Sequence, residues 1–568
     1  RARISRGGGV FSRAAKSIAL SAELKALLAV DEDSLTPARL IHCLLKVEVD
    51  LVWNGGIGTY VKGSLQSDIE VGDRANDEVR VNGSELRCRV FGEGGNLGMT
   101  QQGRVEYSLN GGACNTDFID NMGGVACSDQ EVNIKILLNH LVANEDLTPK
   151  QRNLFLAEMT DEVAELVLGQ SSRQILGISL ARYRCENNLA EFWNCIVDWE
   201  AEGIINRKLT GLPDDDVLVD RQKKQQGLTR PELAVLASHS KLLLKGQLRG
   251  ADVLDDEYLG QALLRAFPPA MTARYGEQMT QHPLKNDIIA NQLTNEIVDR
   301  MGLSFVHRLM KSTGAAAGQV VRASTIVSDV LRLDEVWAEL DGLNHQQARE
   351  QFALQARLMR LGRRATRWIL RNRRNCTDTR GEIERFDPLL KEMLDTSIAS
   401  CIDEPGESQS ELGGYLAMGL TPYAAILMDS ANDLFFAFGM ADVSIRTGLS
   451  IDLVSETYGH LEEALSLNWF SDQIIDLTSD NRWEDFAKES FIDEMETLYR
   501  AMAVQILNDL DSTAQIEERI QHWRKSQAML FERWQLMIRE LRQSPQRNYA
   551  MFSVALRELQ DLVDTLAA

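Results

Sequence analysis

Glycines cluster in two short segments of the first hundred residues, 54–59 and 92–100, and each segment also holds one asparagine. Each segment follows a β-rich run, VEVDLVW at 47–53 and LRCRVF at 86–91, which predicts a buried strand with a loop at its carboxyl end. Ligands of open α/β sheets bind at that edge, where glycine lets backbone N–H groups approach them closely. The pattern therefore predicts a ligand-binding edge, with a pair of tight turns as the alternative reading.

A third cluster, NMGGVACSDQE at 121–131, joins two glycines to Ser128 and Glu131. It precedes an apolar pattern of helical period, so it is predicted to lie just before a helix. Hydroxyl and amide groups at a helix N-terminus are suited to receive a substrate carboxylate. The usual pyrophosphate fingerprint GxGxxG is absent, because the third glycine of GEGGNLG comes one residue too late.

Glycine content divides the chain, because residues 1–145 hold 18 of its 40 glycines. In that part the order of strand, loop, helix and strand predicts a parallel α/β sheet, with a helix over 36–45 capped by Thr36. The expected fold class is α/β, a partial Rossmann-type nucleotide-binding domain, followed by a large mainly α-helical region. The expected domains are 1–145, a helical connector at 146–225, and a C-terminal helical region at 226–568, with two subdomains as an option.

Helical periodicity dominates after residue 130. Thr229 and Glu232 form a capping-box pattern that predicts a helix start. Pro388 is one of several prolines expected to mark a helix start or an interruption. Further helices are predicted near 289–312, 346–373, 386–401, 431–447, 486–509, 514–542 and 548–566.

Composition excludes several classes of protein. The net charge is −22, which disfavours binding to nucleic acid and to anionic membranes. No run of about 18 apolar residues predicts a membrane span, and no secretory signal opens the chain. Eight cysteines without a CxxC pair argue against a zinc site or a redox dithiol, so no metal is expected and a reducing cytoplasm fits best. The start at Arg1, just before a glycine run, predicts a fragment of a longer protein.

Several motifs together resemble the catalytic and C-terminal regions of the large bacterial NAD-specific glutamate dehydrogenases. The resemblance spans nearly the whole chain, and its glycine motifs are the most specific part. The motifs are DLVWNGGIGTYVK (50–62), GDRAND (72–77), GEGGNLGMTQQGRVEY (92–107), NTDFIDNMGGVACSDQEVNIK (115–135), GLTRPELAVL (227–236) and RRATRWILR (363–371).

Smaller glutamate dehydrogenases carry an AEGAN segment and a later N-x-GGV-x-x-S-x-x-E segment, to which 92–96 and 121–131 are similar. The resemblance implies that Ser128 hydrogen-bonds the distal carboxylate of glutamate or 2-oxoglutarate, that Val125 packs against its methylenes, and that Gly124 belongs to the same substrate contact. It also implies that Asn96 and Asn121 border the nicotinamide and its ribose. The remaining implied cofactor contacts are Asn54, Gly55, Gly56, Gly58, Glu93, Gly94 and Gly95.

The activity implied by the resemblance is NAD-dependent oxidation of L-glutamate to 2-oxoglutarate and ammonia by the intact enzyme. The catalytic lysines and aspartate of that family lie upstream of its nucleotide domain, and the GGG at 7–9 resembles a point already inside that domain. We therefore expect no catalytic residue in this chain, which should be inactive alone. A homo-oligomer formed through the helical region is expected, whereas effectors, subunit number and a preference between NAD and NADP are not readable.

Two alternatives remain. The chain is read either as a non-catalytic helical scaffold or regulatory module, or as part of a related amino-acid dehydrogenase with another substrate. Ser128 discriminates the second, because an apolar substrate side chain offers it no carboxylate.

Eight arginines between residues 357 and 374 make a basic helix in an acidic chain. Apolar residues interleave with them, so pairing with the protein's own acidic groups is favoured over an anion site or a subunit contact. The amphipathic stretch 522–543 is likewise predicted to pack in a core rather than on a membrane. The arginines are Arg357, Arg360, Arg363, Arg364, Arg367, Arg371, Arg373 and Arg374.

Overall fold

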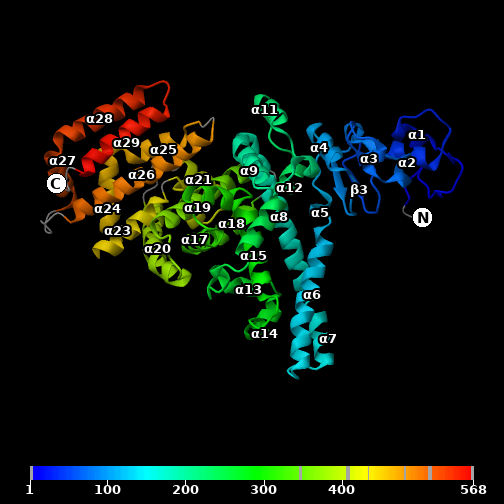
Figure 1. Cartoon of the computed structure of the whole chain (residues 1–568), viewed down its shortest axis with the longest axis horizontal. Coiled ribbons are helices and arrows are strands. Elements are labelled where there is room, and N and C mark those ends of the chain that lie inside the picture. The colour runs from blue at the N-terminus through cyan, green and yellow to red at the C-terminus, as the bar shows by residue number, and fades with distance from the viewer. Residues whose placement is uncertain are drawn as a thin grey trace. The chain divides into compact units, whose positions relative to one another are not determined.

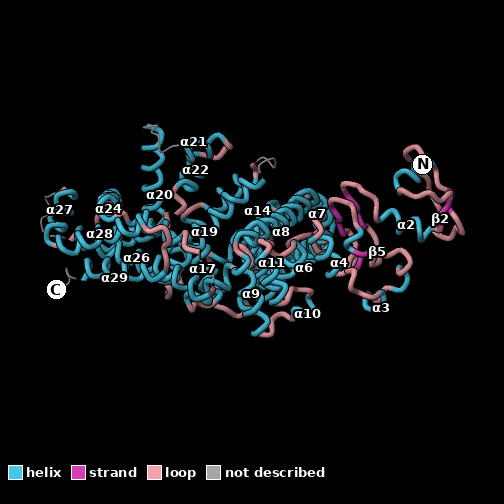
Figure 2. The backbone as a smooth tube through the Cα atoms, turned by 90° about the horizontal axis from the view of Figure 1, so that it is seen from above, coloured by secondary structure: helices cyan, strands magenta, loops and turns pink. Residues whose placement is uncertain are grey.

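The structure is a computed structural model that describes residues 4–343, 348–403, 410–432, 434–478, 481–508 and 515–564. The chain divides into two compact units. Unit 1 comprises Arg1–Arg249 and Gln261–Ser304, and unit 2 comprises Gly250–Gly260 and Phe305–Ala568. All named strands lie in the first part of unit 1, and the rest of the described chain is helical (Figures 1 and 2). The predicted fold class, a small α/β region followed by a large helical region, is confirmed.

Three two-stranded sheets form the α/β region. Strands β1 (Ile18–Ala19) and β2 (Ser34–Leu35) are antiparallel, whereas β4 (Val61–Lys62) and β5 (Val81–Asn82) are parallel. Strands β3 (Leu51–Asn54) and β6 (Val90–Glu93) are also parallel and pair in register from Leu51 with Val90 to Asn54 with Glu93. The two runs predicted as neighbouring strands are therefore paired, although both strands begin four residues later than predicted.

The sheet of β3 and β6 has one covered face and one bare face. Phe91 and Glu93 point to the covered face, where Phe91 joins a core with Val61, Val81 and Tyr107. On the other face the side chains of Leu51 and Trp53 are 55% and 60% exposed. The prediction of a buried strand is therefore wrong for β3, because only one side of this sheet packs on a core in the described part of the chain.

Several helices of unit 1 begin at sequence-encoded caps. Thr36 accepts a hydrogen bond from the Arg39 amide at the start of α2, and the predicted pairing of Thr229 with Glu232 opens α12. The helices are α1 Ala22–Leu28, α2 Pro37–Leu45, α3 Asp68–Val71, α4 Gln101–Leu109, α5 Asp117–Asp120, α6 Met122–Ala143, α7 Pro149–Glu158, α8 Thr160–Asn187, α9 Leu189–Ala201, α10 Arg207–Thr210, α11 Asp215–Lys223, α12 Arg230–Leu248, α13 Ala262–Arg265, α14 Pro269–Met279 and α15 Lys285–Met301.

Unit 2 is helical throughout its described residues. Its α-helices are α16 Phe305–Thr313, α17 Ala317–Val330, α18 Leu333–Asp341, α19 Ala348–Asn372, α20 Thr379–Asp403, α21 Ser410–Ala417, α22 Pro422–Asp429, α23 Phe436–Thr447, α24 Ile451–Leu465, α25 Leu467–Ile475, α26 Arg482–Leu507, α27 Ile516–Ser526, α28 Ala528–Gln543 and α29 Tyr549–Asp564. No described helix is long and apolar enough to cross a membrane.

Three helix predictions need correction. Within its described residues, the single helix expected at 514–542 is two helices, α27 and α28, which are separated by the non-helical backbone of Gln527. The single helix expected at 289–312 is two helices, because Gly302 adopts φ 92° and ψ 158° and ends α15. Pro388 lies inside α20 rather than at its start. A proline there removes one backbone hydrogen bond, but Phe386 and Leu390 on either side are fully buried, and their packing outweighs that cost.

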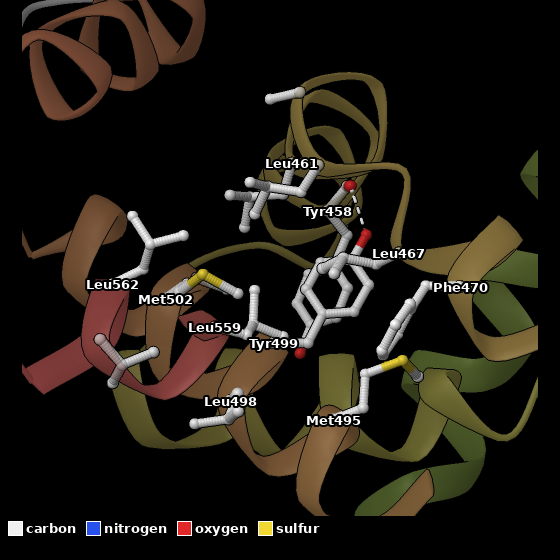
Figure 3. Close-up of a cluster of buried hydrophobic side chains, with 14 of the residues drawn as sticks. Tyr458, Leu461, Leu467, Phe470, Met495, Leu498, Tyr499, Met502, Leu559 and Leu562 are labelled. Atoms are coloured by element: carbon white, nitrogen blue, oxygen red, sulfur yellow. Dashed lines mark hydrogen bonds between the residues drawn. The ribbon is translucent and has the colours of Figure 1, made fainter. Parts of the chain in front are cut away.

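The core of unit 2 is rich in aromatic side chains (Figure 3). The rings of Tyr458 and Tyr499 lie 4.3 Å apart, and the Tyr499 hydroxyl donates to the Tyr458 carbonyl oxygen at 2.6 Å. Trp534 is fully buried and donates to the carbonyl of Leu465 at 2.9 Å. Trp523 and Phe531 are buried as well, so the prediction of core packing for 522–543 is confirmed.

The arginines of α19 pair with acidic side chains of unit 2. Arg363 contacts Glu489, Arg367 lies 2.7 Å from Asp493, and Arg357 lies 3.3 Å from Glu411. The prediction that this basic helix pairs with the protein's own acidic groups is confirmed.

Candidate functional site

The two glycine segments meet at the carboxyl ends of β3 and β6. The Gly95 amide donates to the Asn54 carbonyl at 3.1 Å. A Cβ atom on Gly95 would lie 2.4 Å from the Gly56 carbonyl oxygen, so the two loops pass backbone against backbone and only glycine fits. Trp53 lies over β6, where a Cβ on Gly94 would come within 2.5 Å of its ring. The expected neighbourhood of the two loops is confirmed.

Asn96 and Asn121 are in direct contact. The Asn121 side-chain amide donates to the side-chain oxygen of Asn96, which places the second glycine loop against the start of α6. The same loop is held by Asp117, whose carboxylate accepts from the Leu97 amide at 2.8 Å. Two amide side chains are thus presented together beside the edge of the sheet.

The residues predicted to bind the substrate share one face of α6. Asn121 precedes the first helical residue, and Gly124, Val125 and Ser128 follow it by three, four and seven positions, the spacing of a single helix face. Val125 is 71% exposed and Ser128 is exposed. At 1.5 Å of rise per residue, Ser128 lies about 10 Å along the helix from Asn121.

Residues 122–131 form the first turns of α6, whereas they were predicted to lie just before a helix. Glycine costs about 1 kcal/mol in a helix, but Ile134, Leu137 and Leu141 further along α6 are buried and favour one continuous element. The glycines leave a bare patch, since a Cβ on Gly123 or Gly124 would meet nothing within 4 Å. A ligand can therefore approach the backbone of this turn closely.

Glu93 is fully buried at the end of β6. Its carboxylate accepts from Arg104 at 2.6 and 2.9 Å and from the Met99 amide at 3.0 Å. Burial raises the pKa of Glu93, and the Arg104 guanidinium and the Met99 amide oppose that rise. This predicted cofactor residue therefore holds the loop from inside.

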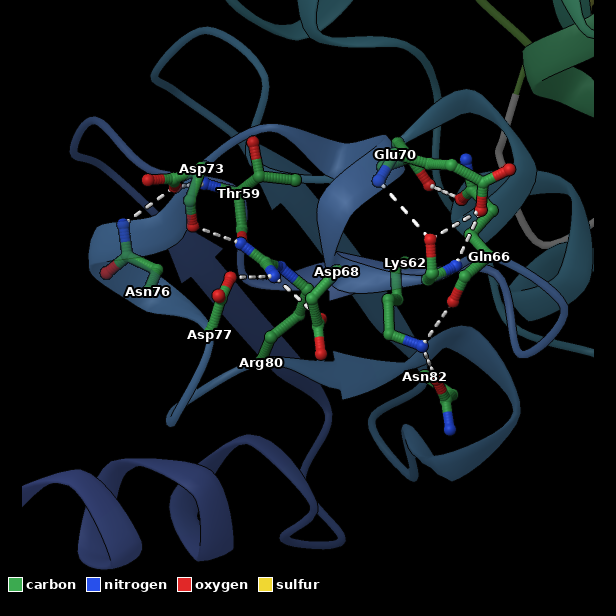
Figure 4. Close-up of polar contacts among 12 residues, drawn as sticks. Thr59, Lys62, Gln66, Asp68, Glu70, Asp73, Asn76, Asp77, Arg80 and Asn82 are labelled. Carbon is green, nitrogen blue, oxygen red and sulfur yellow. Dashed lines mark hydrogen bonds and ion pairs between the residues drawn. The ribbon is translucent and has the colours of Figure 1, made fainter.

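A second network fixes the loop that carries GDRAND (Figure 4). The buried Arg80 guanidinium lies 2.7 Å from Asp68 and 2.6 Å from Asp77, and it donates to the Thr59 carbonyl at 2.9 Å. The Thr59 amide donates to the Asp73 carboxylate at 2.8 Å, which lowers the pKa of Asp73. These contacts anchor the segment that follows Gly58, whose φ of 124° suits glycine.

The donor and acceptor groups at this edge fit part of a dinucleotide. Gly55 and Gly56 are exposed, and the side-chain nitrogen of Asn54 is buried with no hydrogen-bond partner in the described structure. Exposed amides and bare glycine backbone suit a carboxamide and a ribose. Among the described residues, no group of three His, Cys, Asp or Glu side chains could hold a metal ion.

Sequence reasoning did not single out the charged residues behind the loops, Arg104, Asp117 and Asp120. Arg104 bridges Glu93 and Asp117, and Asp120 accepts from the Glu93 amide at 2.9 Å. All three lie inside the motifs quoted above. Their charges stand out within segments that are otherwise rich in glycine and apolar residues, and this pattern could have pointed to them.

Comparison with known proteins assigns the chain to a family. A family model described as the catalytic domain of bacterial NAD-glutamate dehydrogenase matches residues 1–181, and one described as the C-terminal region of glutamate dehydrogenase matches 225–561. The chain belongs to the bacterial NAD-specific glutamate dehydrogenases. In this family member, the first residues of the C-terminal match share unit 1 with the catalytic match.

Three relatives are named NAD-specific glutamate dehydrogenase. The relative from Pseudomonas aeruginosa is 44% identical over 99% of this chain, that from Halomonas elongata 40% over 99%, and that from Mycobacterium tuberculosis 32% over 100%. The chain spans about 35% of the length of each of them.

Proposed function

We propose that the intact protein oxidises L-glutamate to 2-oxoglutarate and ammonia with NAD as hydride acceptor, and that this chain supplies part of both pockets. The observation that carries the proposal is the contact of Asn96 with Asn121 at the common edge of β3 and β6. It sets the loop predicted for the cofactor against the helix face predicted for the substrate.

The roles follow the chemistry of these side chains. Asn96 and Asn121 orient the carboxamide and ribose of the nicotinamide, beside Asn54 and the exposed backbone of Gly55 and Gly56. NAD supplies the hydride acceptor when it is bound. Gly58, Glu93, Gly94 and Gly95 shape the loops that carry these groups.

On α6, Ser128 binds the distal carboxylate, and Val125 packs against the methylenes, beside the bare backbone of Gly124. The spacing supports this, because Ser128 lies two helical turns beyond Asn121 on the same face. A substrate that reaches from the nicotinamide to Ser128 needs an acidic side chain, which favours glutamate over amino acids with apolar side chains.

The bare face of β3 is the surface on which we place the remainder of the NAD-binding domain. Leu51 and Trp53 leave a large apolar area in water here, whereas parallel sheets are normally covered on both faces. The relatives are much longer than this chain, so another segment of the intact protein would cover this face and supply the lysines and the aspartate. We place homo-oligomer contacts on the helical region, where Met529 and Leu536 of α28 are exposed.

The test of the proposal is Ser128→Ala in the intact protein. We expect the KM for glutamate to rise roughly tenfold to hundredfold, because one charge-assisted hydrogen bond contributes about 1.5–3 kcal/mol. The affinity for NADH should stay within twofold of the wild-type value. Steady-state kinetics and a fluorescence titration with NADH provide these two measurements.

The matched control is Ser172→Ala, which removes an exposed serine hydroxyl from α8. This control should leave the KM for glutamate and the affinity for NADH unchanged. An unaltered glutamate KM in Ser128→Ala would remove this serine from the substrate site, and with it the preference for an acidic substrate.

A further inference from the structure

The N-terminal end of α12 contacts the catalytic segment of unit 1 through two hydrogen-bonded routes. The first starts at Arg230, whose Nε donates to the Asn115 side-chain oxygen at 2.9 Å. The Asn115 amide donates to Asp120 at 2.8 Å, and Asp120 accepts from the backbone amide of Glu93 at 2.9 Å. This route ends on the residue that precedes the loop of Gly94, Gly95 and Asn96.

A second route reaches the same residue from its side chain. The Gln101 side-chain amide donates to the Pro231 carbonyl at 3.1 Å, and its oxygen accepts from Arg104 at 3.3 Å. Arg104 then donates twice to the Glu93 carboxylate. Residues 230 and 231 are therefore connected to both the main chain and the side chain of Glu93.

Arg230 is held by neutral partners. Besides Asn115, it donates to the Ser179 hydroxyl of α8 at 2.7 Å. Burial and the nearby Arg182 lower the pKa of Arg230, and the Asp120 carboxylate opposes this effect from a distance. Desolvating a guanidinium that has no carboxylate in hydrogen-bond contact is costly, so its hydrogen bonds must offset that cost. A planar fork can reach two partners at fixed angles, which gives this site a positional role.

We propose that Arg230 is a positioning residue for the cofactor loop at 93–96, so that the start of the C-terminal family segment sets the geometry of the catalytic segment. The inference deepens the proposed function and rests on it only for the role of that loop in binding NAD. Glu93 is the meeting point: its amide is fixed by Asp120 and its carboxylate by Arg104, and both contacts lead back to α12.

The test compares Arg230→Met with wild type in the intact protein by hydrogen–deuterium exchange without ligand, followed by titration with NADH. We expect amide exchange in the peptide covering 90–98 to accelerate about tenfold or more, since a charge-assisted hydrogen bond is lost. The affinity for NADH should fall severalfold. Arg249→Met, which removes an exposed arginine from the other end of α12, should change neither measurement.

Three further variants separate a positional role from a merely structural or electrostatic one. Asn115→Ala should accelerate the same peptide, and the double variant with Arg230→Met should add little, because both substitutions cut one route. Arg230→Lys keeps the charge but cannot form both hydrogen bonds, so it should restore the exchange rate only in part.

Exchange at 90–98 within twofold of wild type in Arg230→Met would overturn the inference, and so would full rescue by lysine. Accelerated exchange with unchanged affinity for NADH would keep the positional role and count against the proposed function of the loop.

Discussion

Arg104→Met will destabilise the loop at 92–100 more than any other single substitution at the candidate site. The variant leaves the Glu93 carboxylate buried without its cation, and breaking such a pair costs about 3–5 kcal/mol. Asp117 loses a partner at the same time. Hydrogen–deuterium exchange of the peptides between residues 86 and 104 in the intact protein measures the free energy of local opening.

The loss of stability in Arg104→Met should depend on pH in a definite direction. A carboxyl group that has lost its cation takes up a proton more readily, so the folded-state pKa of Glu93 rises further in the variant. The stability of the variant should then decrease as the pH rises through the folded-state pKa of Glu93. The deficit relative to wild type should therefore be larger at pH 7 than at pH 5.

Two controls accompany Arg104→Met. Arg89→Met removes an exposed arginine that lies 3.4 Å from Asp50, and it should cost well under 1 kcal/mol. The double variant Glu93→Gln with Arg104→Met removes the stranded charge and keeps an acceptor for the Met99 amide, so it should recover part of the loss. If Arg104→Met exchanges no faster than Arg89→Met, the buried pair does not hold the loop.

Glu489→Gln will loosen the packing of α19 on α26 in unit 2. Burial disfavours the charge of Glu489, but Arg363, Arg367 and Arg308 outweigh that effect and hold its pKa far below 4.5. Removing the carboxylate leaves these arginines with fewer acidic partners. The expected cost at pH 7 is about 3 kcal/mol, the lower end of the range for buried pairs, because the side chain is 17% exposed.

The acid response should change with it. A carboxyl group whose folded pKa is depressed contributes stability above its unfolded value of 4.5, and this contribution is lost as the pH falls below that value. Glu489→Gln should therefore flatten the acid limb of the stability profile of unit 2. Hydrogen–deuterium exchange of the peptides of α19 and α26 between pH 3 and 7 measures this change in stability.

Glu496 lies seven residues later on α26. Its substitution is a control whose effect on stability should change with pH in the opposite direction. Burial raises its pKa to about 6, against the effect of Arg500. The folded state thus binds the proton more tightly, and the stabilisation is present below pH 4.5 and declines as the pH rises to about 6. Glu496→Gln should remove a decrease of about 2 kcal/mol between those values. Identical pH profiles for the two variants would contradict both assignments.

Local signals predicted the elements with short-range causes. Thr36 and Thr229 cap helices where their patterns indicated, because a cap depends on residues only three positions away. Apolar runs that end in glycine predicted the parallel pair of β3 and β6. The same reasoning failed at 122–131, where buried residues two to four turns later extend α6 back over the glycines.

The candidate site was predictable as a set of motifs, but not as an arrangement. The sequence indicated Asn96, Asn121 and Ser128, and only the fold shows that the first two touch and that Ser128 shares a helix face with Asn121. The outward exposure of Ser128 follows from α6 packing its other side on a core.

By itself, the sequence determined the family resemblance, the helical character after residue 130, the caps and the glycine loops, since these depend on composition and on neighbours a few residues apart. The tertiary structure decided which charges lie together, such as Arg230 against Asn115, which are 115 residues apart. Such partners are chosen by the way helices and strands pack, and side-chain hydrogen bonds form only where packing brings donor and acceptor within about 3 Å.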